Sequence, residues 1–278
     1  MVEKNKGFQV GAHIAMVILS LCCIFPFLLL IMSSITDEQE LIRNGYTLFP
    51  KALSLNAYQY MFKSSNKIIS AYGITILSTV VGTLCGLSMT ILMAYPLSRR
   101  DLPGRNGLAF YVFFTMLFSG GLVPTYIMYT RYIKVSNTIW ALIIPSLMVN
   151  AFYVIMMRTY FSTNIPEAVI EAARIDGAGR MRTMLQILLP LTLPGLVAVG
   201  IYTFLNAWDD YLMSMTIMQV NNMKTLPVGL AQSFLGEYAH DYGALMAFSM
   251  AGSLPIVLLF VFFQKYMVSG LTAGAVKG

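Results

Sequence analysis

The sequence predicts an all-α integral membrane protein, because it is rich in apolar residues, poor in charge and divided into long apolar runs. Of its 278 residues, 57% are hydrophobic and 11% are charged, whereas roughly a quarter of the residues of a soluble domain are charged. The runs are continuously apolar and do not alternate as the strands of a lipid-facing barrel must. Helices are therefore the predicted spanning element.

Six runs approach or exceed the ~20 helical residues that cross a bilayer core about 30 Å thick. They lie near residues 9–32, 71–96, 107–130, 138–157, 191–218 and 244–265. The first run is longer than the apolar core of a signal peptide and leads to no clear cleavage site, so we expect it to remain as the first helix. No loop is long enough to bury its own core, and we expect residues 1–278 to form a single transmembrane domain.

Basic residues predict the orientation, because Lys and Arg are retained on the cytoplasmic side. With six spans and both termini in the cytoplasm, eleven Lys and Arg residues fall inside and seven outside. The inside residues cluster at span ends, as Arg99 and Arg100 do. The net charge of +6 therefore indicates topology, and it implies no nucleic-acid partner.

We expect structural roles for the two outside loops, the histidines and the cysteines. Residues 33–70 form the first outside loop, in which Ser54 is a plausible N-cap of a short amphipathic helix. Residues 219–243 form a second outside loop that includes His240. That residue and His13 have no further ligands at a suitable spacing, so no metal site is predicted. The three cysteines lie within spans, which favours packing roles: Cys22, Cys23 and Cys85.

The inside loop of residues 158–190 carries a predicted short helix with acidic and small residues. Asn164 and Glu167 have the spacing of an N-cap and its third residue, and Pro166 falls in the first turn. Gly177 supplies the permissive backbone that ends the helix. One interpretation is a helix lying on the membrane surface. The low bulk of Ala172 and the acidic residues favour the alternative, a helix that docks into a protein partner.

This loop resembles the EAA loop of binding-protein-dependent ABC importer permeases in three segments: Glu171-Ala172-Ala173, Asp176-Gly177-Ala178 and Ile187-Leu188-Leu189-Pro190. The resemblance implies a type I ABC importer permease fold, in which the loop is a coupling helix seated in a cytoplasmic ATPase. It implies that Glu171 contacts a basic residue of the ATPase, that Ala172 and Ala173 permit close approach, and that Asp176 and Gly177 shape the turn.

Two further stretches are similar to carbohydrate importers of the maltose-permease type: IPEAVIEAARIDGA in the loop and GLTAGAVKG at the C-terminus. The resemblance implies that the tail reaches the ATPase interface through Gly274, Ala275, Val276, Lys277 and Gly278. It also implies a bacterial cytoplasmic membrane location and four kinds of protein or substrate partner: a second homologous permease, two ATPase subunits, an extracytoplasmic sugar-binding protein and a carbohydrate. The sequence has no phosphate-binding Gly-rich loop ending in Lys-Ser or Lys-Thr, so no cofactor is expected on this chain, and ATP and Mg²⁺ are expected on the ATPase.

Polar and aromatic residues within spans are candidates for the substrate pathway, because polar groups in lipid turn toward a cavity or a partner. The candidates are Asn150 and Tyr153 in the fourth span, and Asn206, Trp208, Asp209, Asp210 and Tyr211 in the fifth. Alternatively, Asp209 and Asp210 pair with a basic residue of the second permease.

Two other classes of function remain open from the residues alone. An ion-coupled secondary transporter could use Asp209 and Asp210 as its ion site. A membrane-embedded enzyme could combine the same carboxylates with His13 or His240, although these residues form no recognisable motif. The lack of an obvious inverted repeat among the six spans disfavours the secondary transporter.

Overall fold

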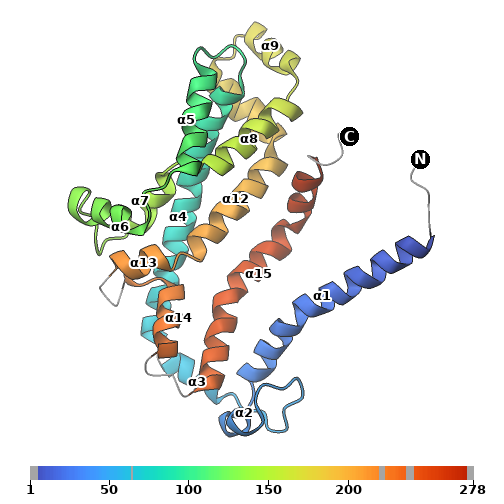
Figure 1. Ribbon diagram of the computed structural model, residues 1–278, viewed down its shortest axis with the longest axis vertical. Helices are drawn as coiled ribbons and strands as arrows, with labels where there is room; N and C mark the ends of the chain where they lie inside the picture. The colour runs from blue at the N-terminus through green and yellow to red at the C-terminus, as the bar shows by residue number, and fades with distance from the viewer. Residues whose placement is uncertain (1–5, 64, 219–222, 236–240, 274–278) are drawn as a thin grey trace. The chain divides into compact units, whose positions relative to one another are not determined.

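The computed structural model describes residues 6–63, 65–218, 223–235 and 241–273, and these residues are predominantly helical (Figure 1). The helices are α1 (Lys6–Ser34), α2 (Glu38–Asn44), α3 (Asn56–Lys63), α4 (Ser65–Ser98), α5 (Arg105–Leu117), α6 (Leu122–Ile127), the π-helical η1 (Met128–Tyr132), α7 (Trp140–Leu147), α8 (Ala151–Asn164), α9 (Glu167–Ile175), α10 (Arg180–Arg182), the π-helical η2 (Thr183–Leu188), α11 (Leu189–Leu191), α12 (Leu193–Trp208), α13 (Leu212–Ile217), α14 (Leu226–Leu235) and α15 (Tyr242–Ala273). Within the described ranges, β pairing is limited to an isolated bridge between Thr36 and Leu53. The predicted all-α class is confirmed.

Three of the six predicted spans are continuous helices, and three are broken. Gly7–Ser34, Ile68–Ser98 and Tyr242–Lys265 are each long and apolar enough to cross a membrane. The other candidates are helix pairs bent by 106° (Arg105–Leu117 and Leu122–Tyr132), 45° (Trp140–Leu147 and Ala151–Asn164) and 87° (Arg180–Leu191 and Leu193–Ile217). The described residues therefore provide six candidate spans when each bent pair is counted once.

Each break has a local cause in the backbone. At the first, Gly121 adopts a φ of +80°, a conformation that glycine allows at little cost. At the second, Met148 and Asn150 are extended and Asn150 caps the following helix. At the third, Thr192 leaves the helix (φ −101°, ψ 10°), and Pro194 has no N–H to continue the ladder.

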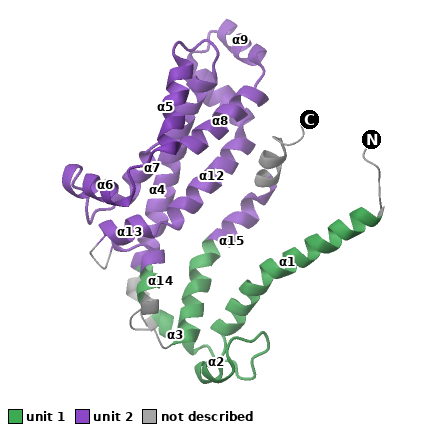
Figure 2. Ribbon diagram, in the orientation of Figure 1, with its two compact units in different colours: residues 1–69, 229–255 green, residues 70–228, 256–278 purple. Residues whose placement is uncertain are grey.

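The described residues form two compact units (Figure 2). The first consists of residues 1–69 and 229–255, and its buried cluster includes Ala244, Leu245 and Phe248. The Glu38 carboxylate accepts the backbone N–H groups of Tyr242 at 2.9 Å and Gly243 at 2.8 Å. This carboxylate therefore satisfies two of the donors that the start of a helix leaves unpaired.

The short helix expected in the first outside loop is present as α3. The Ser54 hydroxyl accepts the N–H of Asn56 at 3.2 Å, so Ser54 has the capping role expected of it, at a helix that begins with Asn56. In the same unit, the hydroxyl groups of Ser34 and Tyr58 lie 2.8 Å apart and form a hydrogen bond.

The second unit consists of residues 70–228 and 256–278, and within it α8 packs against α5 and α12 (Figure 1). Its core contains side chains that are almost fully buried: Ala94, Leu97, Val154, Met157, Leu188 and Val199. The start of α14 is tied to α4, because the Thr75 hydroxyl accepts the Leu226 N–H at 2.7 Å. Helix α9 lies at one end of this unit (Figure 1).

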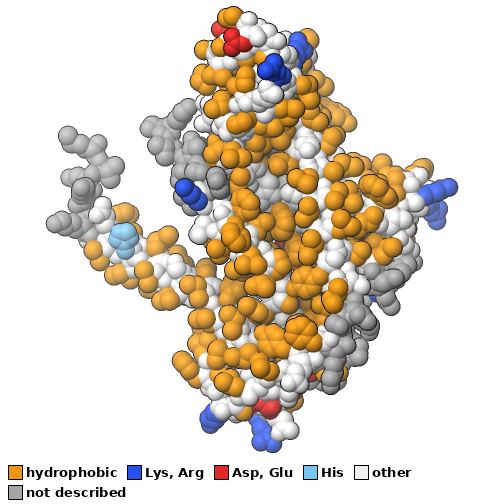
Figure 3. Space-filling model, turned by 180° about the vertical axis from the view of Figure 1, so that it is seen from behind, with side chains coloured by type: hydrophobic (Ala, Val, Ile, Leu, Met, Phe, Trp, Pro, Cys, Tyr) orange, Lys and Arg blue, Asp and Glu red, His pale blue; other side chains and the backbone are white. Residues whose placement is uncertain are grey.

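Much of the surface is apolar, as a lipid-facing chain requires. Figure 3 shows hydrophobic side chains covering most of the visible face, with few charged groups among them. None of the apolar window of α1 is buried within the chain. Such large exposed apolar area indicates contact with lipid or with another protein.

Candidate functional site

Helix α9 and its C-terminal turn follow from Pro166 and Gly177. Pro166 precedes the helix in an extended conformation (φ −61°, ψ 138°), whereas Gly177 adopts a φ of +74°. The N–H of Gly177 donates to the Arg174 carbonyl at 3.0 Å, and the N–H of Ala178 donates to the Ala173 carbonyl at 2.9 Å. These two bonds form a Schellman motif, which needs a left-handed residue after the helix. Gly177 thus ends the helix in the way predicted for it.

The predicted N-cap of this helix is wrong. Asn164 is the last residue of α8, and its amide nitrogen donates back to the Tyr160 carbonyl at 3.2 Å. The N-cap position of α9 is Pro166, which provides no side-chain cap. The backbone of Asn164 remains helical because α8 continues through it, so its side chain cannot serve the next helix.

The two faces of α9 differ in exposure. Ile170 and Ala173 are buried within the chain, at 6% and 3% exposed. Glu171, Ala172 and Ile175 are exposed, and Ile175 retains 86% of its surface. The predicted small pair is therefore divided, because Ala173 packs inward whereas Ala172 faces out. The outward face therefore combines an acidic, a small and an apolar side chain that are open to a partner.

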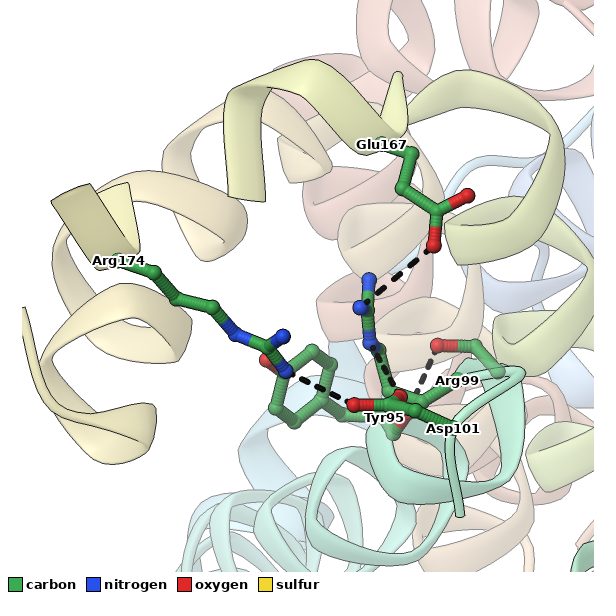
Figure 4. A network of polar contacts seen from close by, with 6 residues as sticks. Tyr95, Arg99, Asp101, Glu167 and Arg174 are labelled. Atoms are coloured by element: carbon green, nitrogen blue, oxygen red, sulfur yellow. Dashed lines mark hydrogen bonds and ion pairs between the residues drawn. The ribbon is translucent and has the colours of Figure 1, made fainter. Parts of the chain in front are cut away.

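Ion pairs fasten both ends of α9 to the residues that directly follow α4 (Figure 4). At the start of the helix, Glu167 Oε1 lies 3.7 Å from an Arg99 guanidinium nitrogen. At its end, Arg174 donates to Asp101 Oδ2 at 2.8 Å, and Arg99 Nε donates to Asp101 Oδ1 at 3.2 Å. The four charges alternate in sign, so a displacement of α9 would be transmitted to the residues that follow α4.

The hydrogen bond from Arg174 is the main cause that lowers the pKa of the Asp101 carboxyl, and the charge of Arg99 adds to it. Both groups of the Arg174–Asp101 pair are about half exposed. Exposed pairs contribute little to stability individually. The network matters because ion pairs at both ends of α9 fix the orientation of the helix.

A second candidate site is a cavity of about 290 Å³ in the same unit. It is lined by residues of α4, α7, α8, α12 and α13 and of the segments between them: Ser78, Gly86, Thr90, Leu142, Pro145, Ser146, Met148, Asn150, Tyr153, Thr203, Asn206, Ala207, Asp210, Met213 and Thr225. Four residues predicted for the substrate pathway meet here, namely Asn150, Tyr153, Asn206 and Asp210. Hydroxyl, amide and carboxylate groups thus face a partly apolar cavity.

The polar groups of this cavity are held by hydrogen bonds. The Asn206 amide donates to the Tyr153 hydroxyl and to the Tyr202 carbonyl. The rings of Tyr153 and Tyr202 stack with centroids 6.4 Å apart. Asn150 Oδ1 accepts the N–H of Phe152 at 3.0 Å, so its amide nitrogen is the end that can bind a ligand. This arrangement can provide donors, acceptors and an aromatic face, which are the groups that bind sugar hydroxyls and rings.

Three other predicted residues do not line the cavity. Trp208 is only 3% exposed and stacks on Phe204 with ring centroids 5.8 Å apart, which is a packing role. Asp209 lies at the C-cap of α12, and its N–H donates to the Leu205 carbonyl at 2.9 Å. Tyr211 follows it before α13 and is likewise absent from the lining.

Four small residues of α4 beside the cavity were not among the predicted site residues. Ser78, Gly82, Gly86 and Thr90 recur every four residues and so share one helix face. A Cβ atom added at Gly82 would lie 2.8 Å from the Ser146 hydroxyl oxygen, and one added at Gly86 would lie 2.8 Å from the Ser146 carbonyl oxygen. The two glycines let α4 approach the end of α7 closely, and this spacing was visible in the sequence.

The remaining predictions concern residues without a described site. Among the described residues, no group of three or more His, Cys, Asp or Glu side chains could hold a metal ion. The thiols of Cys22, Cys23 and Cys85 are free. His240 and the tail, Gly274, Ala275, Val276, Lys277 and Gly278, lie outside the described residues.

Comparisons with known proteins identify the family. Residues 86–272 match the family described as binding-protein-dependent transport system inner membrane component. The polygalacturonan/rhamnogalacturonan transport system permease protein YtcP of Bacillus subtilis is 31% identical and covers 99% of this chain and 100% of its own length. The arabinooligosaccharides transport system permease protein AraQ of Halalkalibacterium halodurans is 34% identical over 92% of this chain and 91% of its own.

A solved structure has the same fold. It is a crystal structure of a bacterial ABC transporter involved in the import of the acidic polysaccharide alginate, and it matches with a TM-score of 0.83, 23% identity and coverage of 96% of this chain and 99% of that chain. This likeness confirms the predicted ABC importer permease fold. Together with the family match over about two thirds of the sequence, it leads to one conclusion: the chain belongs to the inner membrane components of binding-protein-dependent transport systems.

Proposed function

We propose that the chain is the permease subunit of an ATP-driven importer that moves a sugar or oligosaccharide across the cytoplasmic membrane. The chain is a non-catalytic membrane component, and ATP with Mg²⁺ binds a separate ATPase subunit. The names of the relatives, which refer to polygalacturonan, rhamnogalacturonan and arabinooligosaccharide transport, support a carbohydrate substrate. The observation that carries the mechanism is α9, a helix with a small acidic outer face that ion pairs fasten to α4.

In this mechanism α9 seats in the ATPase through Glu171 and Ala172, while Ile170 and Ala173 hold it to its own chain. Asp176, Gly177 and Ala178 form the turn that fixes the end of the helix. Closure of the ATPase subunits around nucleotide would displace α9, and the network of Arg99 and Asp101 would carry that displacement to α4. Nucleotide must bind the two states of the transporter with different affinity, since equal affinity would shift no population.

The matched test is charge reversal on the outer face. Glu171→Lys should release the ATPase or uncouple ATP hydrolysis from uptake, and Glu171→Gln should have a smaller effect. Asn106→Lys places the same side chain at an exposed position of α5 and should leave coupling intact. Co-purification of the ATPase and uptake by vesicles are the measurements. Normal uptake by Glu171→Lys would refute the coupling role.

On the substrate side, we propose that Asn150, Tyr153, Asn206 and Asp210 contact the sugar as it passes. Asn206→Ala should alter the stimulation of ATPase activity by substrate while the complex still assembles. Trp208 is assigned to packing, so Trp208→Ala should instead reduce the amount of folded protein. Unchanged stimulation in Asn206→Ala would remove the cavity from the pathway.

The assembly and orientation complete the proposal. A second homologous permease would cover part of the exposed apolar surface, two ATPase subunits would bind the cytoplasmic side, and an extracytoplasmic sugar-binding protein would deliver the substrate. Both termini would be cytoplasmic, with residues 274–278 at the ATPase interface. An ion-coupled transporter that uses Asp209 and Asp210 is disfavoured by the family.

A further inference from the structure

A second cavity, of about 630 Å³, lies where the end of α4, the start of α5, the end of α8 and the start of α9 meet. Its charged lining residues are four arginines and one carboxylate: Arg99, Arg100, Arg105, Arg158 and Glu167. Ser162 and Thr163 add hydroxyl groups. The lining therefore has a formal charge of +3, from four positive groups and one negative group.

The arginines differ in how their charge is balanced. Arg99 has two carboxylate partners, Asp101 and Glu167. Arg105 and Arg158 are half-buried, and in the described part of the chain neither guanidinium forms an ion pair or a side-chain hydrogen bond. A partly desolvated charge is costly unless an opposite charge accompanies it. The guanidinium groups of Arg105 and Arg158 are therefore available to an anionic ligand.

The surface beside the cavity indicates which anion fits. Leu108 and Tyr111 follow Arg105 on α5 at the i+3 and i+6 positions and are 49% and 65% exposed. At a rise of about 1.5 Å per residue, they lie roughly 5–9 Å further along the helix axis than Arg105. A basic cavity next to an exposed apolar helix face suits a ligand with an anionic head and apolar chains, whereas free phosphate would use the head site alone.

We propose that this cavity binds the phosphate headgroup of an anionic phospholipid, with Arg105 and Arg158 as its principal partners and the acyl chains lying along α5. Basic pockets between membrane helices bind such headgroups by the attraction of fixed positive charge for phosphate. A bound lipid would neutralise the cavity beside α9 and brace the junction of α4, α5 and α8. The site is separate from the substrate cavity and does not depend on the transported sugar.

The test measures lipid retention by the full chain within its assembled transporter. The protein is purified in detergent, equilibrated with equal amounts of phosphatidylglycerol and phosphatidylcholine, and weighed intact by native mass spectrometry. We expect selective retention of phosphatidylglycerol. Retention should fall about fivefold for Arg105→Gln, and about fivefold further when Arg158→Gln is combined with it. Arg105→Lys should retain most of the lipid.

Arg131→Gln is the matched control, because it removes the same charge at an exposed position outside the cavity. An equal loss in this variant, or equal retention of the neutral lipid, would overturn the proposal. Displacement by millimolar inorganic phosphate would assign the site to a soluble anion. No retention by the assembled transporter, with retention once the ATPase is removed, would assign the cavity to acidic side chains of that partner. If the double glutamine variant aggregates, the single variants and the lysine variant decide the outcome.

Discussion

Substitution of Gly86 by alanine tests the close contact between α4 and the end of α7. The new Cβ atom would lie 2.8 Å from the Ser146 carbonyl oxygen and 3.3 Å from the Thr203 methyl carbon. The carbonyl is a backbone atom and cannot rotate away, so the two elements must separate by about 0.6 Å to reach an ordinary contact of 3.4 Å. Overpacking of this kind costs about 1–3 kcal/mol.

Gly73 provides the control on the same helix. A Cβ atom added there meets nothing within 4 Å, so Gly73→Ala should gain up to about 1 kcal/mol of helix propensity without any overlap. Gly86→Ala gains the same helix propensity but is destabilised by the overlap with Ser146. The difference in unfolding free energy between the two variants therefore isolates the contact, and we expect about 1–3 kcal/mol in favour of Gly73→Ala.

Unfolding in a titration of denaturing detergent, followed by circular dichroism, measures that difference in the purified protein. Vesicle uptake gives a second measurement, because Gly86 lines the substrate cavity whereas Gly73 does not. We expect Gly86→Ala to lower uptake and Gly73→Ala to leave it unchanged. Equal stability of the two variants would show that α4 and α7 do not approach as described.

Three further predictions concern the coupling segment and the cavity. Gly177→Ala should increase amide exchange at the end of α9 about fivefold, from the ~1 kcal/mol cost of a left-handed alanine, whereas Gly179→Ala, at a φ of −66°, should not. Arg174→Gln should raise the pKa of Asp101 toward its ordinary value in a carboxyl-carbon NMR titration. Because the pKa of Asp101 is lowered in the folded protein, the pair stabilises the protein at pH values above the ordinary aspartate pKa. This stabilisation is lost as the pH falls through the lowered pKa. Tyr153→Phe removes the Asn206 acceptor and should lower the unfolding free energy by about 1 kcal/mol, measured in the same detergent titration.

The sequence predicted the helical class and the end of α9 at Gly177, because both depend on local signals. Apolar runs identify spans by length alone, and the left-handed Gly177 ends α9 through its own backbone. The straightness of the spans was not predictable in the same way. A bend of 106° between α5 and α6 depends on the φ of +80° at Gly121, and apolar length carries no information about which glycine adopts that conformation.

Only some of the residues that line the cavity of about 290 Å³ were among the predicted ones, because the prediction selected residues by their chemistry and not by their position. Asn206 and Asp210 meet Tyr153 in one cavity, but Trp208, on the same stretch, points into the core. Helical periodicity places Trp208 on a different face from Asn206 only if the residue at which α12 ends is known. The small residues of α4 were not predicted because serine, threonine and glycine are common in apolar helices. Only their four-residue spacing distinguishes them.

The division of α9 into an inner and an outer face explains how a short helix can transmit force. Ile170 and Ala173 are buried against the chain, and Arg174 and Glu167 are anchored beside α4 by opposite charges. Each ion pair is weak alone, but pairs at both ends oppose rotation as well as translation. Asp101→Asn and Arg174→Gln should therefore each reduce uptake, and the double variant should lose little more than Asp101→Asn alone, because both changes break the same pair. Unchanged uptake in both single variants would mean that the apolar face alone holds the helix.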